Sequence, residues 1–182
     1  MNDVFKLLNI SYKRRMEKVN VYDRNRELTD VIRERNKLEE GEYRISVHIW
    51  IINNANKLLI QQRVSTARKF PNMWSQTGGG VLVNESSKET VKRESKEELN
   101  LEIDENEIYY IGSYVRKKDI VDVWLVKKEI DIDKLKLESS EVKKVKLATF
   151  QEFDNMIEEG VVVPSINPSY LLIKNYYENY NR

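Results

Sequence analysis

The chain has 182 residues, of which 31 are basic and 30 are acidic, and its formal net charge is +1. This length suits one globular domain, and the balanced charge gives no overall field that would attract nucleic acid or an anionic membrane. Cysteine is absent, which excludes disulfides, thiolate metal sites and thiol nucleophiles. We therefore expect a single domain over 1–182, with a short N-terminal extension at about 1–16.

The first ten residues lack a basic leader and a long apolar run. No stretch of the sequence approaches the roughly 20 apolar residues that a helix needs to cross a bilayer. The sequence therefore predicts a cytoplasmic protein with neither a membrane nor a nucleic-acid polymer as a partner.

Two antiparallel hairpins are predicted early in the chain, over 18–35 with a turn at 23–26 and over 43–63 with a turn at 53–57. The first strand of the second hairpin has a wholly apolar side and a mixed side that carries His48. This is the only histidine. Metal sites usually recruit several ligands, so a structural role is favoured for it.

Later segments predict a strand pair over 113–132 and a further strand over 143–150. Two helices are then expected, over 151–159 and 168–180. In the second of these helices a stripe recurs at helical spacing and serves either internal packing or a homodimer contact. Its members are Tyr170, Ile173, Tyr177 and Tyr180.

A capping box formed by Ser86 and Glu89 predicts a helix over 87–99 that follows a glycine loop. On a helical wheel three lysines form one stripe, and three glutamates gather on the opposite side. The lysines are Lys88, Lys92 and Lys96, and the glutamates are Glu94, Glu97 and Glu98.

This charged helix has two interpretations. It is either a solvated helix with ordinary surface pairs, such as Glu89 with Arg93, or a helix that holds a hard divalent cation. No cation of the same helix is expected to face the three glutamates, so we predict that they converge on magnesium.

The spacing of glycine, acidic and basic residues through this loop and helix resembles the Nudix box, the signature of Nudix hydrolases. Its members here are Gly79, Glu85, Arg93, Glu94, Glu97, Glu98 and Leu101. The predicted strands and helices around the box follow a compatible order. The resemblance implies an α/β protein with the Nudix fold, an α/β/α sandwich with a mixed β-sheet. It also implies hydrolysis of a diphosphate linked to another moiety, often in a nucleoside diphosphate derivative.

The resemblance also implies roles for individual residues. The catalytic set comprises Glu85, Arg93, Glu94, Glu97 and Glu98, in which Glu85 and Arg93 brace the loop against the helix. The three remaining glutamates bind Mg²⁺, or Mn²⁺ in its place, together with the carbonyl of Gly78. The general base is left open among Glu94, Glu138 and Glu141. Two positions depart from the family pattern, Ser95 in place of an aliphatic residue and Asn100 in place of glycine. Asparagine tolerates the left-handed turn expected there.

A small-molecule diphosphate substrate requires cations near the box. Arg63 is favoured for phosphate contact, and Arg68 and Lys69 are equally open to a solvated role. We also assign Gly79 and Gly80 to substrate binding. The leaving moiety is left open, because nearby aromatic residues serve either base stacking or the core, with the core favoured. They are Trp74, Tyr109, Tyr110 and Tyr114.

Two rival functions remain. Residues 61–80 look like the matching segment of isopentenyl-diphosphate isomerases, which share the Nudix fold. That family uses a cysteine at the position of Gly79 and a metal-binding histidine at the position of Val81, and this chain has neither. An isomerase-like Nudix hydrolase is therefore favoured over an isomerase. A non-catalytic Nudix-like nucleotide-binding module is disfavoured, because the acidic set is complete.

Overall fold

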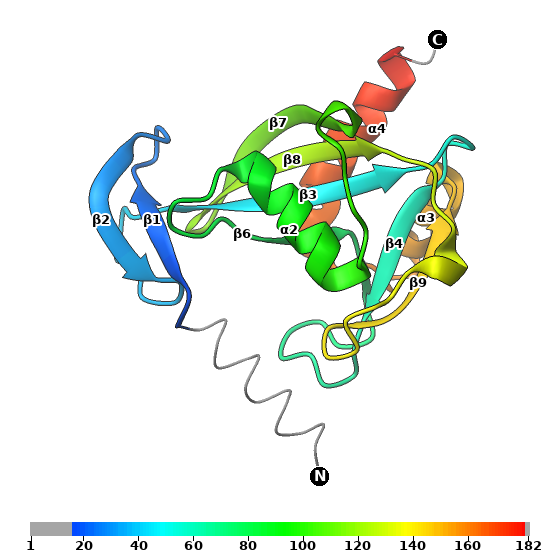
Figure 1. Cartoon of the computed structure of the whole chain (residues 1–182), viewed down its shortest axis with the longest axis horizontal. Coiled ribbons are helices and arrows are strands. Elements are labelled where there is room, and N and C mark those ends of the chain that lie inside the picture. Colours follow the sequence, from blue (N-terminus) through cyan, green and yellow to red (C-terminus); the bar gives the residue numbers. More distant parts are fainter. Residues whose placement is uncertain (1–15, 181–182) are drawn as a thin grey trace.

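The computed structural model describes residues 16–180 (Figure 1), so the expected N-terminal extension lies outside the described residues except for Met16. The strands are β1 Lys18–Tyr22, β2 Leu28–Glu34, β3 Arg44–Ile52, β4 Leu58–Arg63, β5 Trp74–Ser75, β6 Thr77–Gly80, β7 Ile108–Arg116, β8 Asp119–Lys127 and β9 Val142–Ala148. The α-helices are α2 Ser87–Leu99, α3 Phe150–Glu158 and α4 Asn167–Tyr180, and the 3-10 turns are η1 Glu105–Glu107, η2 Ile132–Lys134 and η3 Pro164–Ile166.

Strand β3 is the centre of a seven-stranded mixed sheet. It pairs in parallel with β8 along its whole length, and β8 pairs antiparallel with β7. On its other side β3 changes neighbour. Its first half pairs with β6, from Ser46 to Ile49, whereas its last two residues, Ile51 and Ile52, pair with β4. Strands β5 and β9 flank β4.

The sheet is covered on both sides, which confirms the predicted α/β sandwich with a mixed sheet (Figure 1). Alternation along β3 decides which side each residue faces. Ile45, Val47, Ile49 and Ile51 pack with residues of α2, such as Val91, in one core cluster. Trp50 and Ile52 pack in the other cluster with residues of α3 and α4. The mixed side of β3 therefore faces α4.

Two expectations about the elements were wrong. The predicted glycine loop at Gly78–Gly80 is the strand β6, because these residues find partners on β3. Strand β7 begins at Ile108 and passes through Gly112, although it was expected after that residue; a register shift between Tyr110 and Gly112 accommodates the glycine. The three predicted hairpins and helix 87–99 are confirmed. The third hairpin ends at Lys127, about five residues before the predicted end at 132, and the other boundaries differ by at most about two residues.

Three members of the α4 stripe, Tyr170, Ile173 and Tyr177, pack inside the protein, and the Tyr180 side chain lies outside the described residues. Tyr170 and Ile173 are buried, and the Tyr170 hydroxyl donates to Asp154 Oδ1 at 2.7 Å. Tyr177 stacks on Phe150 with ring centroids 4.6 Å apart. These contacts fix α4 against α3. Within residues 16–180, no helix combines the length and apolarity needed to span a membrane.

Candidate active site

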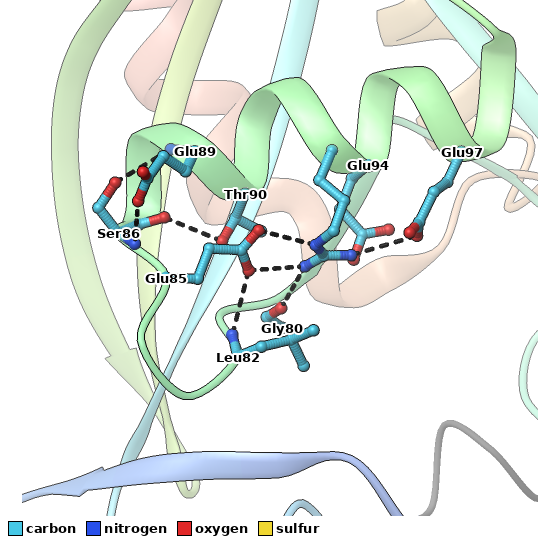
Figure 2. A network of polar contacts seen from close by, with 9 residues as sticks. Gly80, Leu82, Glu85, Ser86, Glu89, Thr90, Glu94 and Glu97 are labelled. Carbon is cyan, nitrogen blue, oxygen red and sulfur yellow. Dashed lines mark hydrogen bonds and ion pairs between the residues drawn. The ribbon is translucent and has the colours of Figure 1, made fainter.

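Helix α2 begins and ends as its sequence predicts. The hydroxyl of Ser86 accepts from the Glu89 backbone N–H at 3.1 Å, and the Glu89 carboxylate accepts from the Ser86 N–H at 2.7 Å (Figure 2). Asn100 closes the helix in the left-handed conformation at φ 53°, and its N–H donates to Lys96 O and Ser95 O. These caps fix the first and last turns, and so they fix the orientation of the acidic face.

Arg93 connects the helix to the preceding strand and loop. Its partners Gly80, Glu85, Glu94 and Glu97 are labelled in Figure 2. Its guanidinium donates to both carboxylate oxygens of Glu85, at 2.7 and 2.9 Å, and to the carbonyl oxygen of Gly80 at 2.9 Å. It also donates to Glu94 at 2.8 Å and to Glu97 at 3.2 Å. This is the bracing geometry that the sequence resemblance implies.

The Arg93 contacts correct one expectation. A cation of the same helix does face the glutamates, because Arg93 reaches its neighbour Glu94 and, one turn on, Glu97. The surface pair of Glu89 with Arg93, which belonged to the solvated interpretation of the helix, is not found among the described residues, because Glu89 caps the helix. The lysine stripe pairs elsewhere, as expected: Lys88 and Lys92 bind Glu105, and Lys96 binds Glu102.

The bracing pair is ionised. Burial raises the pKa of Glu85, but hydrogen bonds from Arg93 and from the Leu82 N–H outweigh it and hold that pKa below its usual range. Burial lowers the pKa of Arg93, and the neighbouring carboxylates of Glu85 and Glu94 reverse this and raise it. The loop is therefore attached to α2 by full charges.

The three glutamates lie in different environments. Glu94 and Glu98 are buried, whereas the Glu97 side chain is 54% exposed. The Glu94 carboxylate lies so close to Gly79 that a Cβ on that glycine would be 1.8 Å from Oε1, so a side chain at position 79 would require Glu94 to move. Glu98 accepts a hydrogen bond from Gln61 at 2.9 Å.

The arrangement does not yet form a closed metal site. Within residues 16–180, no group of three or more histidine or acidic side chains is close enough to hold a metal ion. Arg93 Nη1 donates to both Glu94 and Glu97, so a guanidinium lies between these two carboxylates, and the convergence of all three glutamates on a metal ion stays a prediction. The donor set nevertheless fits magnesium, since buried carboxylate oxygens are hard ligands and the glycine at 79 leaves space for one of them.

A cleft of about 300 Å³ lies beside Glu98, between β3, β4 and β6. It brings Arg63 and Lys69 to the same cavity as Glu98, Gly78 and Gly79. Arg68 is exposed and does not line the cleft, and Gly80 is buried outside the cleft lining. The two remaining cations thus face a buried carboxylate across one cavity.

Several lining residues had no local signal in the sequence. Arg44 and Arg116 belong to strands that meet only through β8, and Arg35 follows β2. Phe70 lines the cleft from a loop. The four aromatic residues expected near the site do not line it: Trp74, Tyr109, Tyr110 and Tyr114. Tyr109 and Tyr110 are exposed on the edge strand β7, so the expectation of core packing was wrong for both.

The remaining candidates for a general base lie near the end of α2. The backbone N–H of Glu138 donates to Glu98 O at 2.9 Å, and Val64 N–H donates to Glu141 O at 3.1 Å. The segment before β9 therefore borders both α2 and the end of β4. The side chain of Glu138 also accepts from the Ser140 hydroxyl at 2.8 Å.

His48 has the structural role that was favoured. Ser169 Oγ donates its one hydrogen to Ile166 O at 2.8 Å and accepts from Trp50 Nε1 at 3.2 Å. Its 2.9 Å contact with His48 Nδ1 therefore requires a hydrogen on that nitrogen. Burial, with help from the charge of Arg116, lowers the pKa of His48 to about 3. The imidazole is neutral in the folded protein.

The His48 pKa predicts a loss of stability in mild acid. In the unfolded chain this pKa is near 6.5, so between pH 6.5 and 3 the unfolded state binds more protons, and stability falls as the pH falls. We expect the free energy of unfolding to drop by about 1.4 kcal/mol from pH 7.5 to 5.5. Urea unfolding at both pH values measures it. His48→Asn keeps an N–H donor and should abolish this drop; an unchanged drop would contradict the assignment.

Comparison with known proteins agrees with this geometry. The NUDIX domain family matches residues 42–165, more than half of the chain. An uncharacterized Nudix hydrolase of Listeria innocua is 32% identical over 151 residues, which are 82% of this chain and 89% of that protein. The range of the family match includes the whole of α2 and the strands β3, β4 and β6 around the cleft.

Solved structures resemble the fold. A crystal structure of a Deinococcus radiodurans protein aligns with a TM-score of 0.71 and 20% identity, over 87% of this chain and 98% of that one. A MutT protein of Methanosarcina mazei aligns with a TM-score of 0.59 and 22% identity, over 79% and 99%. At these identities the likeness concerns the fold alone. With the family match, the close relative and the braced acidic helix together, the chain belongs to the Nudix family of hydrolases.

Proposed function

We propose that this protein is a magnesium-dependent hydrolase that cleaves a diphosphate linkage, in a nucleoside diphosphate derivative. The observation that supports this most is the cleft itself. One wall carries the buried carboxylate of Glu98, and Arg63 and Lys69 lie across the same cavity. A diphosphate needs both kinds of group, cations for its own charge and carboxylates for the metal that accompanies it.

The roles of the residues follow from their positions. Glu94, Glu97 and Glu98, with the carbonyl of Gly78, would hold Mg²⁺, or Mn²⁺ in its place. When bound, a divalent ion supplies charge neutralisation on the diphosphate and a lowered pKa for the attacking water. Arg63 and Lys69 bind and orient the phosphate oxygens. Arg93 and Glu85 keep α2 in register with β6, which preserves the position of the acidic face.

Proton transfer is assigned to a carboxylate near this wall. As water attacks phosphorus, the phosphorus–oxygen bond to the leaving group breaks, and the proton of the water passes to the base. Glu94, Glu138 and Glu141 remain the candidates for that base. Burial of Glu94 against Gly79 would exclude bulk water from one side of the reaction.

The isomerase alternative fits the geometry less well. A cysteine at position 79 would place its Cβ 1.8 Å from the present position of the Glu94 carboxylate oxygen, so Glu94 would have to move to admit that nucleophile. We keep the assignment to an isomerase-like subgroup of hydrolases as part of the proposal. The non-catalytic module has no observation in its favour.

The domain organisation, the localisation and the kind of partner are proposed from the sequence. We propose a single domain over 1–182, located in the cytoplasm, that acts on a small-molecule diphosphate. Homodimer formation stays a prediction. The α4 stripe does not support it, because Tyr170 and Tyr177 pack inside the protein.

A substrate screen tests the proposed function. Purified protein is incubated with nucleoside diphosphates, nucleoside triphosphates, dinucleotides, nucleotide sugars and isopentenyl diphosphate, each with magnesium and with a chelator. We expect magnesium-dependent release of phosphate or a nucleoside monophosphate. Formation of dimethylallyl diphosphate would instead support the isomerase, and binding without turnover across the whole set would support the module.

A further inference from the structure

The cleft has a second polar wall, on the side of the sheet away from α2. Arg44, Ser46 and His48 alternate along β3, so their side chains share the face that is turned toward α4. All three line the cleft, together with Arg116 of β7. None of the four belongs to the box or to the phosphate-binding cations proposed above.

Two buried polar groups on this wall lack partners. Ser46 is 7% exposed, and its hydroxyl has no hydrogen-bond partner in the part of the chain that the structure describes. The Arg44 side chain is 15% exposed, and its Nη1 likewise has no partner within residues 16–180. Buried polar groups are normally satisfied, and a group that is not satisfied needs an explanation such as an ion or a ligand. The two residues lie two positions apart on β3, with Cα atoms about 7 Å apart, and both line the same cleft.

The arginines are held in place and keep donors available. Asp119 of β8 lies between them, and it accepts from Arg44 Nε at 2.7 Å and lies 3.6 Å from Arg116 Nη2. Arg116 Nη1 donates to the carbonyl of Ser165 at 3.1 Å. One carboxylate therefore orients two guanidinium groups and leaves net positive charge on the wall. The third arginine, Arg35, is paired with Glu17.

The burial of Arg44 also favours the binding of an anion in the cleft. Burial lowers the pKa of its guanidinium, and Asp119 only partly offsets this. A buried cation with one unsatisfied donor is complementary to an anion that enters the cleft. His48 lines the same cleft and is neutral, so it adds no competing charge.

We propose that Arg44, Ser46 and Arg116 form a second anion-binding subsite, which takes a carboxylate or a phosphate monoester on the part of the substrate farthest from the scissile diphosphate. That the bound anion is part of a substrate rests on the proposed function, whereas the existence of the anion-binding subsite does not. The substrate class thereby narrows to diphosphates whose organic moiety carries a further anionic group. Fork-shaped guanidinium donors and a hydroxyl recognise both anions, so the test includes both.

Because the chain has one histidine, His48 provides a single reporter inside the cleft. Untagged, metal-free protein is titrated at pH 7.5 in a chelator, once with inorganic phosphate and once with acetate, while the His48 Cε1–H proton resonance is followed by NMR. At this pH the imidazole does not titrate, so a shift of its resonance reports the anion. We expect a saturable shift, and the anion with the lower midpoint identifies the group.

The variants locate the anion. Arg44→Lys and Arg116→Gln should each raise the midpoint about tenfold, and Ser46→Ala about threefold, because charged donors contribute more than a hydroxyl. Ser46→Ala removes a buried unsatisfied group, so it should fold at least as well as the parent, which melting confirms. Arg24→Gln, an exposed arginine outside the cleft, is the matched control and should leave the midpoint unchanged.

The NMR titration tests the subsite whether or not the protein hydrolyses any compound of the substrate screen. If Ser46→Ala and Arg116→Gln bind as the parent does, or if only Arg63→Gln weakens binding, the subsite is refuted even where the screen finds a substrate. A saturable shift that depends on Arg44 and Ser46 supports it, even where the screen finds no turnover and the proposed function fails.

Discussion

Replacing Glu98 by glutamine should lower magnesium-dependent hydrolysis by about 100-fold or more and leave the fold intact. Glutamine keeps the size of the side chain and an oxygen that accepts from Gln61, so the change removes mainly the charge beside the cleft. Magnesium stabilises the folded state by mass action if it binds only that state, so its effect on melting should shrink with the charge. Turnover and melting, each with and without magnesium, measure both effects.

The control for this experiment is Glu89→Gln. Glu89 is exposed on the same helix and caps it through a carboxylate oxygen, a role that glutamine also fills. Its activity and its magnesium effect should match the parent. If Glu98→Gln keeps full activity and full stabilisation by magnesium, then the acidic face is not the metal site. Glu97→Gln, made in parallel, tests whether the exposed third glutamate joins the site when metal is present.

Replacing Arg93 by methionine should reduce the free energy of unfolding by about 3 kcal/mol or more. The guanidinium satisfies both oxygens of Glu85 and the carbonyl of Gly80, all of which are partly or fully buried. Removing it leaves the Glu85 charge without its cation, which is costlier than losing an exposed pair. Urea unfolding of the metal-free protein measures the change.

A matched control is Lys92→Met on the same helix. Its partner Glu105 lies in water, so breaking this pair should cost far less than breaking the Arg93 contacts. Equal losses for the two variants would show that the bracing contacts contribute no more than an ordinary surface pair. The double variant Arg93→Met with Glu85→Gln should recover part of the loss, because it removes the orphaned charge.

The sequence predicted those features whose causes are local. The capping box of Ser86 and Glu89, the left-handed Asn100 and the bounds of α2 depend on residues a few positions apart, and the structure has all of them. The alternation along β3 likewise predicted which residues share a face. The fixed spacing of the box was specific enough to predict the family, although the roles assigned to its residues stay predictions.

Features that depend on distant segments were missed. Gly78–Gly80 form a strand only because β3 lies beside them, and a Cβ at Gly78 would come within 2.4 Å of Val47 O. Arg44 and Arg116 both contact Asp119, which lies on a third strand, and no spacing in the sequence predicts these contacts. The contacts of Arg93 with Glu94 and Glu97 were missed for another reason. The helical-wheel argument compared the glutamates with the lysines of the helix and left out Arg93.

The change of neighbour along β3 has an evolutionary consequence. Because β6 leaves this strand where β4 joins it, one cavity is bordered both by the acidic helix and by the opposite side of the sheet. The residues proposed for the chemistry and those proposed for the second subsite then belong to separate layers. On these proposals, mutations of Arg44, Ser46 or Arg116 would alter which compound is selected without disturbing the packing of α2. Substitutions on one side of the sheet would in this way change the substrate preference, while the reaction centre on the other side stays the same.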